Sequence, residues 1–97
     1  MLAEFSVTPI GAGESVSEYV AECVRILESR GLKYQLTPMA TVVEGETSEV
    51  MDAIMECHRK VMGMSNRVIT SIKIDDRKGR EDAITSKTES VMKRLDR

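Results

Sequence analysis

The order of two hydrophobic periodicities constrains the fold of this chain more than any other feature of its sequence. Strict alternation of apolar and polar residues is typical of a strand with one buried face, and spacings of three and four are typical of an amphipathic helix. The alternation predicts strands over residues 3–8, 33–37, 41–44 and 67–75. The helical spacing predicts one helix between a Ser15–Glu18 capping box and Gly31, and two more over residues 47–62 and 82–94.

This order, strand–helix–strand–strand–helix–strand and then one more helix, is that of the ferredoxin-like split βαβ arrangement. It predicts the α+β class: a four-stranded antiparallel sheet with two helices on one face and an extra C-terminal helix. The first and third strands are expected at its centre. The chain has 97 residues, which suits one domain and is too short for two, so residues 1–97 are interpreted as a single domain.

Charge and composition exclude several classes of function. Fourteen Lys and Arg against sixteen Asp and Glu give a net charge of −2, whereas sequence-independent nucleic-acid binding needs a basic surface. Aromatic residues make up 3% of the chain, too few for the base-stacking strands of an RNA-recognition module, which shares this element order. Because no apolar run approaches the roughly 18 residues of a membrane span, and no signal peptide is recognisable, we expect a cytoplasmic protein that binds neither nucleic acid nor membrane.

The residues that could bind a metal or act as nucleophiles do not form a recognisable site. The chain holds two cysteines, Cys23 and Cys57, and one histidine, His58, whereas a structural zinc site usually needs four such ligands. Both cysteines fall on apolar helix faces and are expected in the core. Neighbouring side chains on a helix do not face each other, so Cys57 and His58 are not expected to form a catalytic pair. The loop at residues 11–13 precedes a helix and could bind an anion, but a simple turn is the favoured interpretation.

Two helices cover only one face of such a sheet, and the other face is expected to be open. Alternation assigns mainly short hydroxyl side chains to it, with one carboxylate, one amine and a few aliphatic groups. An antiparallel sheet can expose one face to water, but a small domain gains stability by binding a partner. We therefore expect a second copy of the chain or a ligand to cover this face. The side chains assigned to it are Glu4, Ser6, Thr8, Gln35, Thr37, Thr41, Val43, Ile69, Ser71 and Lys73.

The central stretch, residues 34–45, reads YQLTPMATVVEG and resembles the signature of the small thiamine-binding protein family, which is related to the YkoF-like proteins. Its flanks, EFSVTPIG near the start and RVITSIKIDDR in the last strand, agree with this resemblance. Position 40 is Ala, where many members have Gly. The resemblance implies a ferredoxin-like fold, homodimers or homotetramers formed through sheet faces and edges, no catalysis and no cofactor. It also implies that thiamine or its hydroxymethylpyrimidine part binds at the sheet face or a subunit junction.

The chemistry of thiamine indicates which side chains could bind it. Its aminopyrimidine ring presents a donor and ring-nitrogen acceptors in one plane, which hydroxyl groups and backbone groups at a strand end can match. Its thiazolium ring is a cation, which a carboxylate or an aromatic face would favour. A structural or regulatory homo-oligomer without a ligand is the alternative function, and an enzyme acting on thiamine phosphates ranks third. The candidate ligand-binding residues are Ser6, Thr8 and Thr41 for the pyrimidine, and Glu4, Glu44 and Tyr34 for the cation; Glu44 is equally interpreted as an acid near the start of the helix at residues 47–62.

Overall fold

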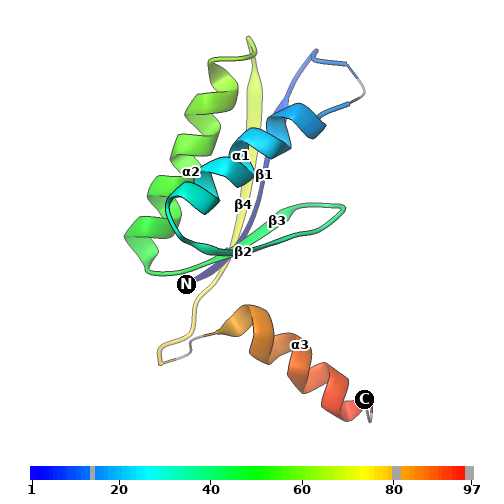
Figure 1. Cartoon of the computed structure of the whole chain (residues 1–97), viewed down its shortest axis with the longest axis vertical. Coiled ribbons are helices and arrows are strands. Elements are labelled where there is room, and N and C mark those ends of the chain that lie inside the picture. Colours follow the sequence, from blue (N-terminus) through cyan, green and yellow to red (C-terminus); the bar gives the residue numbers. More distant parts are fainter. Residues whose placement is uncertain (14, 80–81, 96–97) are drawn as a thin grey trace.

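The predicted fold class is confirmed by a computed structural model, which describes residues 1–13, 15–79 and 82–95 (Figure 1). The four strands form one antiparallel sheet in the order β2-β3-β1-β4, so the first and third strands are central. Helices α1 and α2 pack against each other and against β1. The elements are β1 (Leu2–Pro9), α1 (Ser17–Ser29), β2 (Lys33–Leu36), β3 (Thr41–Glu44), α2 (Thr47–Met62), β4 (Val68–Asp75) and α3 (Ala83–Arg94).

The hydrophobic core lies between the sheet and the two helices α1 and α2. The odd-numbered residues of β1 point into it, as their alternation predicts, and Phe5 is 2% exposed. Helix α2 contributes a stripe at helical spacing, and helix α1 contributes Leu27. The buried residues of this core are Ala3, Phe5, Val7, Cys23, Ile26, Leu27, Val43, Val50, Ala53, Ile54, Cys57 and Val61.

The register of β3 corrects part of the predicted open face. Thr41 lies opposite Phe5, and Val43 lies opposite Ala3. Directly opposite residues of an antiparallel pair share a face, so Thr41 and Val43 point toward the helices, where they are 5% and 0% exposed. The sequence-based assignment to the open face was wrong because this four-residue strand is bulky on both faces, and its alternation does not show which face is buried.

The start of α1 also differs from the prediction. The helix begins at Ser17, and the preceding Val16, at φ −116° and ψ 6°, provides no side-chain cap. The Ser15 hydroxyl instead lies 3.3 Å from the Ser17 hydroxyl. The predicted capping box is therefore absent, because the helix begins one residue later than the box requires, with Val16 rather than Ser15 at the N-cap position.

Helix α2 spans the predicted residues, and the side chain of Glu46 caps its N-terminus. One carboxylate oxygen, Oε2, accepts hydrogen bonds from the backbone N–H groups of Ser48 and Glu49 at 3.1 and 3.3 Å, and from the Ser48 hydroxyl at 2.5 Å. These bonds, that of the Ser48 hydroxyl first, hold the pKa of the Glu46 carboxyl below its ordinary value of 4.5.

The Glu46 cap predicts an acid-dependent loss of stability. Because the folded-state pKa is lowered, the carboxylate stabilises the fold fully above the unfolded-state pKa, and this contribution is lost as the pH falls through the folded-state pKa. Glu46→Gln is therefore expected to unfold at a lower temperature than the wild type at neutral pH, and the two melting temperatures should converge as the pH falls below 4.5. Thermal unfolding followed by circular dichroism over a pH series measures this difference. A difference that stays constant into the acid range would contradict the role of the charged cap.

Candidate functional site

A gap in the sheet lies beyond Thr41, the first residue of β3, where β1 continues without β3 beside it. Strand β1 pairs with β4 from Leu2 to Pro9, but it pairs with β3 only as far as Phe5, opposite Thr41. Beyond that point the hairpin between β2 and β3 turns back, so the second half of β1 has no strand partner on this side among the described residues. The unequal lengths of the two strands thus create a gap inside the sheet.

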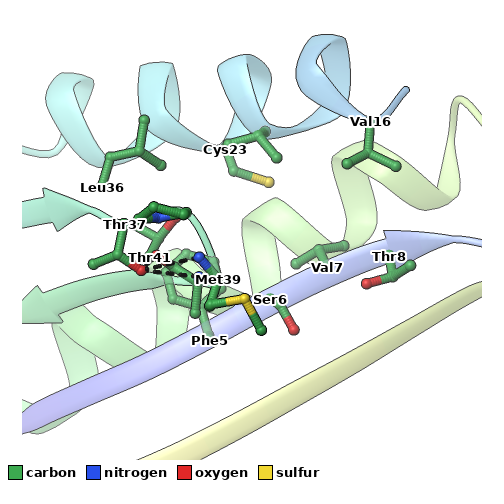
Figure 2. A pocket seen from close by; sticks show the side chains of 13 residues that line it. Phe5, Ser6, Val7, Thr8, Val16, Cys23, Leu36, Thr37, Met39 and Thr41 are labelled. Atoms are coloured by element: carbon green, nitrogen blue, oxygen red, sulfur yellow. Dashed lines mark hydrogen bonds between the residues drawn. The ribbon is translucent and has the colours of Figure 1, made fainter. Parts of the chain in front are cut away.

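A cavity of about 160 Å³ lies at this gap, below the first turns of α1 (Figure 2). Figure 2 shows the side chains of Val16, just before α1, and of Cys23, on α1, extending toward the cavity, and that of Val7 extending from β1 to meet them. The Ser6 side chain points the other way, toward the open face. The lining residues are Phe5, Ser6, Val7, Thr8, Val16, Val20, Cys23, Leu36, Thr37, Pro38, Met39, Ala40 and Thr41.

The hairpin wall of the cavity is a tight turn held by Thr37. The Thr37 N–H donates to the Ala40 carbonyl at 3.0 Å, and the Thr37 hydroxyl donates to the same oxygen at 2.7 Å. The same hydroxyl oxygen accepts from the N–H groups of Met39 and Ala40 at 3.3 and 3.1 Å. Pro38 fixes the backbone angle that the second position of such a turn requires. The Thr37 hydroxyl is therefore occupied by the turn, and Met39 at its tip is 89% exposed.

The Thr41 hydroxyl is a free polar side-chain group on the helix-covered side of the cavity. Thr41 is 5% exposed, and in the described part of the chain its hydroxyl makes no hydrogen bond. None of the buried side-chain polar atoms in the described residues lacks a partner, so the unpaired Thr41 hydroxyl oxygen is still accessible, and Thr41 lines the cavity. Thr41 can therefore donate to, or accept from, a molecule that enters the cavity.

The backbone of Val7 adds a donor and an acceptor at the same place. Met1 and Gly45 exchange two backbone hydrogen bonds, of 2.9 and 3.1 Å. Since alternate residues of a strand direct their backbone groups to the same neighbour, Ala3, Phe5 and Val7 also face the β3 side. No described residue of β3 lies opposite Val7. Its N–H and C=O therefore point, side by side, into the gap.

A second hollow of about 160 Å³ lies on the open face, and the hairpin tip borders both hollows. Glu4 and Lys73 line it and are directly opposite each other in the β1–β4 register. Ser6 and Ser71 form the next opposed pair. The carboxylate of Glu4 could attract a cation here, but the ammonium group of Lys73 partly offsets it.

Two predicted site residues, Tyr34 and Glu44, do not line either hollow. Tyr34 lies opposite Val43 on the covered face, where burial and the nearby Glu28 carboxylate raise the pKa of its hydroxyl. Glu44 accepts hydrogen bonds from the backbone N–H groups of Ala83 and Ile84 at 2.6 and 3.3 Å. Its interpretation as a helix-start acid is thus correct in kind, but the helix that it caps is α3 rather than α2.

Because Glu44 caps α3, Glu44→Ala is expected to loosen this helix and to leave the core unchanged. A hydrogen bond to a carboxylate contributes about 1.5–3 kcal/mol, so amide hydrogen exchange in α3 should accelerate about tenfold or more. Hydrogen exchange measured by mass spectrometry tests this, with Glu89→Ala, an exposed change on α3 itself, as the matched control. Equal exchange in both variants would contradict a capping role for Glu44.

The remaining candidate groups belong to the packing. Cys23 and Cys57 are free and buried, as predicted, and contact with Cys23 together with burial strongly raises the pKa of the Cys57 thiol. His58 Nδ1 lies 2.7 Å from the Thr70 hydroxyl. The described residues include no group of three acidic, histidine or cysteine side chains that could hold a metal ion. Within the same described residues, none of the helices is long and apolar enough to cross a membrane.

Comparisons with known proteins give a consistent picture. Residues 3–92 match the model of a family described as thiamine-binding proteins. The UPF0045 protein YqgV of Bacillus subtilis is 43% identical over 100 residues, with 97% of this chain and 96% of YqgV covered. The crystal structure of MJ1052 from Methanocaldococcus jannaschii superposes with a TM-score of 0.87 at 37% identity, covering 94% of each chain. That of a Thermotoga maritima protein, proposed to act in thiamine biosynthesis or salvage, gives 0.76 at 27% identity, covering 90% and 96%.

Proposed function

Because the chain belongs to the thiamine-binding protein family, we propose that the cavity between β1, the hairpin and α1 binds the aminopyrimidine ring of thiamine. The observation that carries this proposal is the unpaired Val7 peptide group beside the free Thr41 hydroxyl. An aminopyrimidine has an amino donor next to a ring-nitrogen acceptor, and these complement an adjacent carbonyl and N–H. Val16 and Val20 supply apolar contact for the faces of the ring.

The size of the cavity supports one ring rather than the whole vitamin. Pockets for organic ligands usually measure about 300–1,000 Å³, whereas this cavity measures about 160 Å³. The thiazolium ring therefore lies outside it. Glu4 lines the adjoining hollow on the open face, and its carboxylate is positioned to attract this cation. Tyr34 and Glu44 line neither the cavity nor this hollow.

Binding without turnover suits the chemistry of the cavity. Of its described lining residues, only Cys23 has a titratable side chain, and general acid–base catalysis needs a positioned proton donor or acceptor. We accordingly propose a non-enzymatic, cytoplasmic binding protein that works without a cofactor as a homo-oligomer.

One observation favours the alternative, a homo-oligomer without a ligand. Strand β4 is a sheet edge eight residues long, and Ile72 and Ile74 on it are 38% and 47% exposed. Long apolar edge strands tend to pair with another chain. Such pairing would provide hydrogen-bond partners for the outer backbone groups of β4. It would leave the Val7 peptide group and the Thr41 hydroxyl, at the gap in the sheet, without partners.

Titration calorimetry separates the two functions. We expect heat on adding thiamine or hydroxymethylpyrimidine, and none on adding the isolated thiazole half. Absence of heat with all three compounds, at millimolar concentration and with the assembly intact by light scattering, would favour the ligand-free oligomer. Heat with the thiazole half but not with hydroxymethylpyrimidine would contradict the proposal that the cavity binds the aminopyrimidine ring.

A further inference from the structure

Helix α3 is held to the rest of the described chain only near its start. Besides the Glu44 cap, Lys33 lies 3.3 Å from Asp82 and 3.0 Å from the Thr85 hydroxyl, and Lys87 lies 2.7 Å from Asp75. Every residue from 87 to 95 is exposed. Figure 1 shows the helix projecting away from the sheet and from the two helices that cover it.

The projecting part of α3 carries an apolar stripe. Ile84, Thr88, Val91 and Leu95 follow one another at spacings of four, three and four residues, which places them on one side of the helix. Val91 and Leu95 are 56% and 53% exposed. Since an isolated helix of this length is marginal in water, α3 needs a surface to cover this stripe.

The dimensions of the chain agree with an unpartnered arm. The radius of gyration is 14.5 Å and the longest extent is 46 Å. A compact chain of this length is expected to have a radius of gyration of about 12.5 Å. The excess shows that part of the chain lies outside the compact body, and α3 is the element that extends from it (Figure 1).

An apolar groove of matching character lies between α1 and the hairpin. It encloses about 700 Å³ of open space, and at its rim Leu36 and Val16 are 56% and 37% exposed. Groove and cavity adjoin, because they share five lining residues: Val16, Val20, Leu36, Thr37 and Pro38. The apolar walls consist of Val16, Val20, Ala21, Val24, Leu36 and Pro38.

Charge is compatible with docking of α3 in this groove. Arg94 flanks the α3 stripe near the end of the helix, whereas Lys87, on the same side of the stripe, is already paired with Asp75 at 2.7 Å. The groove offers Glu28 as an acidic partner, while its one basic residue, Arg25, is already paired with Glu22 at 2.6 Å. A basic, amphipathic helix and an acidic-edged apolar groove are complementary.

We propose that α3 of one copy of the chain lies in the α1–hairpin groove of a second copy, reciprocally, and covers the mouth of the cavity. The α3 stripe of each copy then covers the groove of the other copy, and both exposed surfaces are buried. The consequence for the ligand rests on the proposed function: the partner helix would enlarge and close a site that is too small and open in one chain. The docking itself does not depend on a ligand.

Mixed disulfide cross-linking tests the exchange without thiamine. Val91→Cys and Leu36→Cys are both exposed changes, and the native thiols are buried. Under mild oxidation we expect covalent dimers when the two variants are mixed, and few with either variant alone. Lys93→Cys, on the opposite side of α3 from the stripe, is the matched control and should cross-link at least tenfold less with Leu36→Cys.

Each other result overturns the proposal. Efficient dimers of Val91→Cys alone would indicate α3–α3 pairing, and those of Leu36→Cys alone would indicate hairpin–hairpin pairing. Monomers in every mixture would show that α3 does not dock.

Leu95→Asp adds a second measurement, since it should convert the wild-type oligomer to a smaller species in sedimentation. Cross-linking that succeeds while calorimetry with thiamine fails would reject the ligand and keep the exchange.

Discussion

Thr41→Val is expected to weaken thiamine binding by about fivefold to thirtyfold, which corresponds to the loss of about one to two kcal/mol with a buried hydrogen bond. Valine keeps the shape of threonine but removes the hydroxyl that faces the cavity. Because this hydroxyl is unpaired in the described chain, the melting temperature should stay the same or rise slightly. Calorimetry and thermal unfolding of the same samples measure both effects.

Thr47→Val is the matched control for this experiment. Thr47 is exposed at the start of α2 and does not line the cavity. We expect Thr47→Val to bind thiamine within about twofold of the wild type, since no hydrogen bond to the ligand is lost. Equal losses in both variants would contradict the specific role given to Thr41.

Val43→Asp is expected to prevent folding, whereas Val42→Asp is expected to give a folded protein. Val43 is 0% exposed and packs beneath the helices, so aspartate there would place an unpaired charge in the core. That costs several kcal/mol, a large part of the about 5–15 kcal/mol that stabilises a domain. Val42, on the opposite face of the same strand, is half-buried and can keep a charge in contact with water.

Soluble yield and far-ultraviolet circular dichroism measure this pair of variants. The comparison tests the facing of β3 directly, because the alternation in the sequence assigned Val43 to the open face. A folded Val43→Asp together with an unfolded Val42→Asp would reverse the orientation of the strand.

The fold could be predicted because its elements are long enough to show their period. Helix α2 was predicted over residues 47–62 and is observed at Thr47–Met62, since its buried stripe repeats over four turns. Strand β1 shows its buried side through three alternating apolar residues. Strand β3 has four residues, and in so short a strand tertiary packing rather than alternation decides which face is buried.

The site could be predicted only in part, because half of it is backbone. Thr41 was selected for its hydroxyl, but on the wrong face of the sheet. Val7 was missed because its contribution is a peptide group, which no side-chain pattern reveals. One signal was present: β1 has eight residues and β3 has four, so a central strand must outrun its neighbour and leave a peptide group unpaired.

The amide proton of Val7 provides the most direct test of the central claim, that the gap in the sheet is the binding site. In a ¹H–¹⁵N titration with thiamine, we expect its resonance to shift in a saturable manner and its hydrogen exchange to slow. Shifts confined to the open face, around Lys73, with the Val7 amide unchanged at saturation, would contradict the account.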